Sequence, residues 1–193
     1  IFACMNYARK AATGKFLIFL NSGDIFYNNN SLRIFFNTSL YANPNRSIIF
    51  GQANIIAPYK INWNFPGSRL KNIEKWLRIF EPNHQSMMIA NKLAKDYEFP
   101  ENYSLVADGF WKRKVINNAH DIIYIKRPLV KFFLDGVSSS KPNSEVLKNI
   151  FKNNNINFIR KLIFALKYFL PKKLFFIYYQ MQKYKSLLID FLF

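Results

Sequence analysis

A short apolar segment of the sequence is followed directly by side chains that suit a metal ion. Residues 16–20 are all apolar, and Asn21, Ser22, Gly23 and Asp24 come next. Proteins commonly hold Mg²⁺ or Mn²⁺ through one or two carboxylates, with substrate phosphates completing the shell, so Asp24 could serve beside a diphosphate. The alternative is a plain turn, because all four residue types favour turns. Spacing alone favours the turn.

Two further places carry side chains suited to substrate binding or proton transfer. His84 and Gln85 offer hydrogen bonds to a hydroxyl or a phosphate, although an isolated pair of this kind more often satisfies buried loop backbone. Asp108 opens a predicted helix, where a carboxylate usually interacts with the helix dipole but can also take a proton from an attacking hydroxyl. Both places therefore have a structural and a catalytic interpretation.

The elements that would position these residues alternate between strands and helices. Apolar runs predict strands over residues 16–20, 47–53 and 121–125, the first buried on both faces of a parallel or mixed sheet. Helical patterns cover residues 32–40, 73–80, 92–97 behind a possible Asn91 cap, and 105–116. This alternation predicts an α/β domain over residues 1–140. The Ser- and Pro-containing residues 138–143 mark its boundary with a tail, residues 141–193.

Composition excludes several classes of protein. Half of the 193 residues are hydrophobic and 18% are aromatic, which is too much for a disordered basic chain. One cysteine and two histidines exclude a disulfide scaffold and a four-ligand zinc site. The net charge of +17 invites a nucleic-acid interpretation, but the basic residues are spread and mostly Lys, and no binding signature accompanies them. No nucleic-acid partner is therefore expected.

The tail is predicted to form basic amphipathic helices. Its apolar residues recur at steps of three and four, while basic residues fall elsewhere on the turn; the apolar set is Ile159, Leu162, Ile163, Leu166, Phe169 and Leu170. Pro171 suits the first turn of a second helix, and residues 174–182 carry no charge. That stretch is shorter than the roughly 18 apolar residues that span a bilayer.

Four blocks of the sequence, in order, resemble inverting family 2 glycosyltransferases with a GT-A fold, of the colanic acid and exopolysaccharide type. Residues 12–26 are similar to the segment around the family's metal-binding motif, in the variety that reads Asn-Ser-Gly-Asp, and Met5 and Asn6 match the segment upstream. Residues 82–86 resemble the family's His-Gln block, and residues 99–108 the stretch that ends in its catalytic aspartate. Residues 128–139 resemble its closing strand and Gly-Val-Ser loop.

The resemblance carries departures as well as matches. The family's upstream aspartate, lysine and glycine fall on Ala3, Tyr7 and Ala8, and the segment after Asp108 is more basic than usual. The family's N-terminal strands, which build much of the nucleoside pocket, would lie before residue 1. The fold expected is therefore the C-terminal part of a Rossmann-like GT-A domain with a mixed central sheet, followed by the basic helices.

The resemblance implies a metal-dependent, hexosyltransferase-type enzyme of cell-surface polysaccharide biosynthesis. It would move a sugar from a nucleotide-sugar donor to a glycan acceptor, which is expected to be linked to a lipid. Asp108 would be the general base and Asp24 the ligand of Mn²⁺ or Mg²⁺. The remaining residues of the donor and acceptor site would be Asn6, Asn21, Ser22, Gly23, His84 and Gln85.

Behind such a domain, a cationic amphipathic tail predicts a peripheral enzyme at the inner, cytoplasmic face of the cell membrane. Its apolar residues would enter the acyl boundary of an anionic surface, with Lys172, Lys173, Lys183 and Lys185 near the headgroups. Alternatively, the tail helices pack on the domain. A further alternative is an inactive truncated remnant, or a basic module that binds membranes or nucleic acid.

Overall fold

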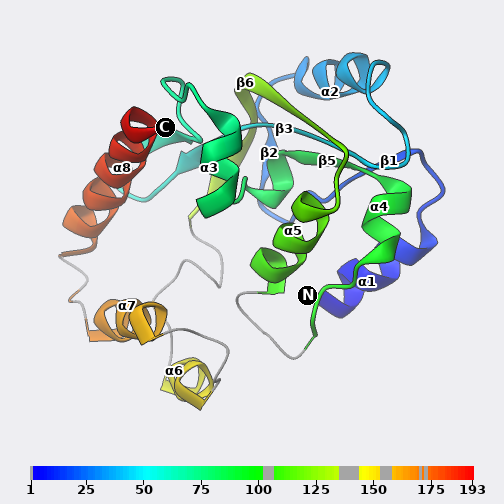
Figure 1. The fold of residues 1–193 in the computed structure, drawn as a ribbon. Helices are drawn as coiled ribbons and strands as arrows, with labels where there is room; N and C mark the ends of the chain where they lie inside the picture. Colours follow the sequence, from blue (N-terminus) through cyan, green and yellow to red (C-terminus); the bar gives the residue numbers. More distant parts are fainter. Residues whose placement is uncertain (1, 102–106, 135–143, 153–157, 170, 172–173) are drawn as a thin grey trace.

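The protein folds as a mixed α/β structure around one curled sheet (Figure 1). The computed structural model describes all residues except 1, 102–106, 135–143, 153–157, 170 and 172–173. Its helices are α1 (Phe2–Ala11), α2 (Ser31–Ser39), α3 (Ile73–Ile79), the 3₁₀ turn η1 (His84–Ser86), α4 (Asn91–Asp96), α5 (Ala107–Asn117), α6 (Ser144–Lys152), α7 (Phe158–Phe169) and α8 (Phe175–Leu192). Its strands are β1 (Phe16–Ile18), β2 (Ile25–Phe26), β3 (Ser47–Ile56), β4 (Asn62–Phe65), β5 (Met87–Ala90) and β6 (Asp121–Phe133).

The sheet has the strand order β1-β5-β3-β6-β2, and β4 pairs with the second half of β3. The long central strands β3 and β6 run parallel, whereas the other pairs are antiparallel. A register shift at Gln52 lets β6 continue through Pro128. The predicted strand at residues 121–125 is therefore confirmed but too short, because the prediction stopped where Lys126 and Arg127 interrupt the apolar run.

Helices cover both faces of the sheet, as the alternation of side chains along β3 requires. Ile48 and Phe50 point into the larger core, which is closed by α1, α3, α4 and α5. Ile49 points to the opposite face and packs under Phe35 of α2. Figure 1 shows α2 on its own side of the sheet and α1, α4 and α5 together on the other. The four predicted helices of the domain correspond to α2, α3, α4 and α5, although residues 105–106 of the last one lie outside the described residues. The Asn91 cap is wrong, because Asn91 is the first residue of α4 and its side chain donates to the Ala12 and Gly14 carbonyls instead.

One expectation about the first strand is wrong. β1 is half-buried rather than buried on both faces, and within the described part of the chain it pairs only with β5, at an edge of the sheet. An apolar run alone does not distinguish a central strand from an edge strand, because the difference depends on which strands lie beside it. Strand β5 lies where the resemblance implies one, directly after the His-Gln block, whereas β2 and β4 were not predicted from the sequence.

The C-terminal helix α8 packs on the domain through one face. Tyr179, Ser186 and Asp190 are buried, and the Asp190 carboxylate accepts a hydrogen bond from the Gly67 amide at 2.8 Å. The Phe193 carbonyl accepts another from the Asn72 amide. The alternative in which tail helices pack on the domain is thus observed for the inner face of α8.

Some expectations about the tail lie outside the described residues. These are the boundary at residues 138–143 and the lysines Lys172 and Lys173. Helix α8 begins at Phe175, so Pro171 precedes it by four residues instead of standing in its first turn. In the described part of the chain, no helix combines the length and apolarity needed to cross a bilayer.

Candidate active site

The turn after β1 holds the predicted metal ligand in a defined place. The Asp24 amide donates to the Asn21 carbonyl at 3.1 Å, and Gly23 has φ +94°, which the third position of a type II turn requires. The carboxylate of Asp24 accepts a hydrogen bond from the Phe133 amide at 2.9 Å. Ser22 and Gly23 are exposed at the tip. The segment is thus a turn, and its carboxylate is anchored beside the end of β6.

A chain of polar contacts joins three of the predicted site residues. The side-chain nitrogen of Asn21 lies 3.2 Å from Nε2 of His84, and Nδ1 of the same ring lies 3.4 Å from Oδ2 of Asp108. When Nε2 accepts a hydrogen bond from the Asn21 amide, Nδ1 carries the ring proton and donates it toward Asp108. The loop after β1, the turn η1 and the first turn of α5 therefore meet at one place.

Asp108 is held in its charged form by its neighbours. Its carboxylate lies 3.3 Å from the Lys112 ammonium, one helical turn further along α5. Burial raises the pKa of Asp108, but the charge of Lys112 and the contacts with His84 outweigh this effect and hold the pKa well below its usual range. An ionised carboxylate next to a hydrogen-bonded imidazole can accept a proton, orient a hydroxyl or bind a cation.

Lys112 is a residue of this site that the sequence analysis missed. It is only 8% exposed, so its ammonium sits in a restricted environment and not on a solvated face. The available signal was the spacing of Asp108 and Lys112 by four residues, which places the two side chains together on one face of a helix.

Gln85 is buried beside these groups and its amide oxygen lacks a partner. The residue is 1% exposed, and Oε1 forms no hydrogen bond with any residue that the structure describes. The η1 turn that carries it is capped by Asn83, whose side chain accepts from the Gln85 amide at 2.9 Å. A buried polar atom without a partner is costly, so this oxygen is a candidate acceptor for a substrate hydroxyl.

Asn6, predicted to contact the donor, is occupied elsewhere. Its side chain accepts from the Phe99 amide at 2.9 Å and donates to the Phe99 carbonyl and to Glu101. Because Asn6 is buried, these bonds anchor α1 to the chain segment that approaches α5. Its observed contacts are those of a residue that positions the backbone.

The fit of a metal ion to this turn depends on the donor set. In the described part of the chain, no group of three or more His, Cys, Asp or Glu side chains could hold a metal ion. Asp24 supplies a single carboxylate, which fits a hard divalent cation whose remaining ligands are diphosphate oxygens and water. The described residues are therefore compatible with a divalent ion that is held jointly by Asp24 and the donor's diphosphate.

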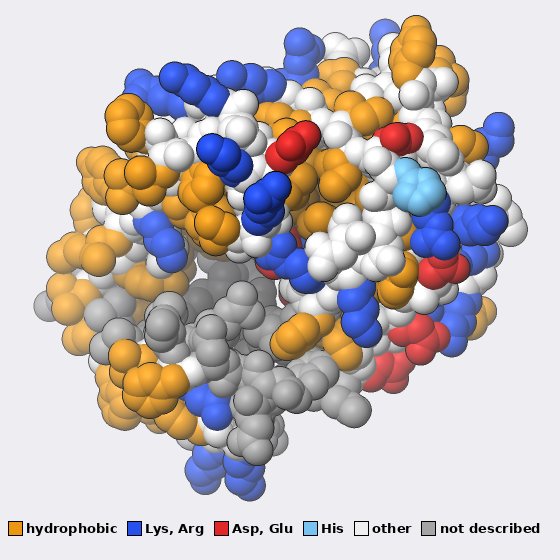
Figure 2. Space-filling view, in the orientation of Figure 1, with side chains coloured by type: hydrophobic (Ala, Val, Ile, Leu, Met, Phe, Trp, Pro, Cys, Tyr) orange, Lys and Arg blue, Asp and Glu red, His pale blue; other side chains and the backbone are white. Residues whose placement is uncertain are grey.

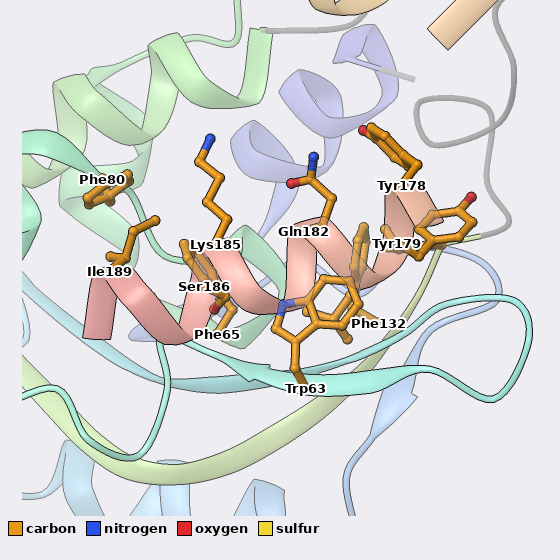
Figure 3. Close-up of a pocket in the computed structure, with 12 residues that line it drawn as sticks. Trp63, Phe65, Phe80, Phe132, Tyr178, Tyr179, Gln182, Lys185, Ser186 and Ile189 are labelled. Atoms are coloured by element: carbon orange, nitrogen blue, oxygen red, sulfur yellow. The ribbon is translucent and has the colours of Figure 1, made fainter. Parts of the chain in front are cut away.

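Two cavities lie away from these residues. One, of about 450 Å³, lies between α8 and the end of the sheet, and Trp63, Phe132 and Tyr178 are among its mostly aromatic lining (Figure 3). The other, of about 1110 Å³, lies between α2 and the edge strand β1. No predicted site residue is among the described residues that line either cavity.

The mixed sheet with its covering helices has a GT-A-like fold. Among solved structures, residues 1–349 of S. aureus TarS match with a TM-score of 0.54 and 16% identity over 86% of this chain and 49% of that one. A second S. aureus TarS structure matches with a TM-score of 0.51 and 16% identity, covering 85% of this chain and 29% of that one. The chain thus spans about half the length of the first structure. No protein-family model and no curated protein matches the sequence.

Proposed function

We propose that the protein is an inverting glycosyltransferase of cell-surface polysaccharide biosynthesis, acting on a nucleotide-sugar donor and a glycan acceptor linked to a lipid. The observation that supports this proposal is the contact chain Asn21, His84 and Asp108. These residues come from three separate blocks of the family resemblance, and the fold brings them within hydrogen-bonding range. The assignment to the colanic acid and exopolysaccharide type is part of this proposal and rests on the sequence resemblance, because the likeness to solved structures supports the fold only.

In the proposed reaction Asp108 is the general base. The acceptor hydroxyl gives its proton to Asp108 while its oxygen attacks the anomeric carbon on the face opposite the leaving nucleotide. Because Lys112 and His84 keep Asp108 deprotonated, the base is ready before the acceptor arrives. An acceptor hydroxyl that replaces one of these contacts would make the carboxylate more basic.

The donor is proposed to lie against the turn after β1. Asp24 would hold Mn²⁺ or Mg²⁺ together with the donor's diphosphate, and such an ion neutralises negative charge on a leaving phosphate group. Asn21, Ser22 and Gly23 would contact the donor from the same turn, and His84 and Gln85 from η1. Asn6 would support the site through the segment that leads to α5.

The test is nucleotide release from a panel of nucleotide-diphosphate sugars, measured with Mn²⁺, with Mg²⁺ and with chelator. We expect release with divalent metal, and loss of release in both Asp24→Asn and Asp108→Asn. Asp121→Asn is the matched control, because Asp121 is an exposed carboxylate at the start of β6. Release at the wild-type rate in both site variants would refute the assigned roles. Metal-dependent binding of the nucleotide sugar without turnover would instead favour the inactive remnant.

A further inference from the structure

Helix α8 carries a second apolar face, opposite the face that packs on the domain. Exposed apolar side chains recur along it at steps of four, three, four and three residues, and they are between 53% and 79% exposed: Ile177, Met181, Tyr184, Leu188 and Phe191. With 3.6 residues per turn this spacing forms one straight stripe, here called the α8 ridge. Large side chains in a continuous exposed row usually mark an interaction surface.

The ridge is held outward because the inner face of α8 is already used. Tyr179, Ser186 and Asp190 are buried against the domain, and Asp190 is tied to the Gly67 amide. Figure 3 shows Ser186 of α8 beside Phe65 and Ile189 beside Phe80. The ridge therefore cannot be buried by rotating α8 about its axis without breaking these contacts.

The charges around the ridge are positive. Lys183 and Lys185 each lie one residue from Tyr184, so a rotation of about 100° per residue places them on opposite flanks of the ridge. The only acidic residue of α8 is Asp190, which is on the inner face. In Figure 2 apolar side chains gather on the flank where Figure 1 places α8 and α7, with basic side chains above and below them.

We propose that the α8 ridge docks on an anionic membrane surface, with α8 lying in the plane of the interface. An apolar stripe flanked by lysines is the pattern of an interfacial helix, whose apolar side chains enter the acyl boundary while the lysines meet anionic headgroups. A second copy of the chain is a poorer occupant, because each copy carries a net charge of +17 and the flanks would repel. Phe158 and Phe169 of α7 are exposed as well.

This docking does not depend on the proposed chemistry, so it is tested by binding alone. The purified chain is sedimented with vesicles of phosphatidylcholine mixed with phosphatidylglycerol, and with vesicles of phosphatidylcholine only, at low and high salt. We expect binding to the anionic vesicles that weakens with salt, since surface charges are screened. Replacing Lys183 and Lys185 by Gln should reduce binding about tenfold or more, since each lysine near the surface contributes about 1 kcal/mol.

The decisive variant is the double substitution Met181→Glu and Leu188→Glu in the ridge. Its matched control is Phe36→Glu and Leu40→Glu, two comparably exposed apolar residues at α2. We expect the ridge variant to stay in the supernatant while the control sediments, with both keeping the wild-type melting temperature. Sedimentation velocity without lipid tests whether the α8 ridge instead binds a second copy of the chain. The proposal would be overturned if the ridge variant and the α2 control bound the vesicles equally, or if the wild type did not bind them. It would also be overturned by a dimer that only the ridge substitutions dissociate.

Discussion

Nδ1 of His84 lies 3.4 Å from Oδ2 of Asp108, although the first stands in η1 and the second in the first turn of α5. Each residue alone has an ordinary structural explanation, as a loop histidine and as a carboxylate near a helix N-terminus. Their contact, extended by Asn21 on one side and Lys112 on the other, makes a polar site out of separate segments.

Asp108→Asn should lower the transfer rate by about 10²–10⁴-fold, the usual contribution of a general base. The amide keeps the shape of the side chain but cannot take the acceptor's proton. The measurement is the rate of nucleotide release at saturating donor, together with the melting temperature. A variant that melts like the wild type and transfers sugar at the wild-type rate would contradict the role of Asp108.

Lys112→Met should make activity sensitive to mild acid. Lys112 lowers the pKa of Asp108, so its loss raises that pKa, and the carboxylate is protonated at a higher pH than in the wild type. The acid limb of the pH–rate profile should therefore shift upward. Lys114→Met is the control on the same helix, because Lys114 is exposed. Identical profiles for wild type and Lys112→Met would contradict this electrostatic coupling.

The same coupling has a consequence for stability. A carboxylate with a lowered pKa stabilises the folded state above its unfolded pKa, about 3.9 for Asp, and this contribution is lost as pH falls toward the folded pKa. The contribution of Asp108 should therefore be intact at neutral pH and decline only below about pH 4. Urea unfolding of wild type and Asp108→Asn across this range measures it. Their difference should shrink in acid, and a difference that grows there would contradict the sign.

Asp24→Asn should abolish the effect of Mn²⁺ on nucleotide binding and leave the fold intact. The amide oxygen can still accept the hydrogen bond from the Phe133 amide, whereas the negative charge that attracts the ion is gone. The measurement is a calorimetric titration of wild type and variant with a nucleoside diphosphate, with and without Mn²⁺, which compares the two affinities. Equal enhancement by Mn²⁺ in wild type and variant would exclude Asp24 as the ligand.

Gly67→Ala should weaken the docking of α8. A Cβ atom at this position would lie 1.6 Å from Oδ2 of Asp190, so the helix or the loop must move, at a cost of about 1–3 kcal/mol. Gly109→Ala, where no atom lies within 4 Å of the added Cβ, should be neutral or slightly stabilising because Ala favours helix. Thermal unfolding and limited proteolysis near α8 compare the two. Equal stability of both variants would show that the Gly67 contact is not tight.

Asn6→Asp separates a positioning role from direct donor contact. The carboxylate loses the two hydrogen bonds that Asn6 donates, and one of its former partners is Glu101, so the free energy of unfolding should fall by about 1–3 kcal/mol. Asn37→Asp, on the exposed side of α2, should have little effect. Urea unfolding and nucleotide titration are measured together. Wild-type stability with lost nucleotide binding would instead support the predicted donor contact.

Much of the local structure could be predicted from the sequence because its causes are local. The periodic apolar residues of α3, α5 and α7 define helices, and the apolar runs of β1 and β3 define strands. The polar residue types at 21–24 indicated a turn, and the structure confirms it. The helix start near Asp108 was predicted for the same reason.

The tertiary structure decided which of these pieces meet. The strand order β1-β5-β3-β6-β2 places β1 at an edge and brings the turn after it to His84, and no local pattern specifies that order. Packing also determined which face of α8 is buried, because the Asp190 carboxylate accepts a hydrogen bond from the Gly67 amide on one side of the helix only. The sequence by itself determined the elements and the chemistry that each could carry, since backbone propensity and side-chain type act over a few residues. The site and the outward ridge arose only from long-range contacts, whose partners are far apart along the chain.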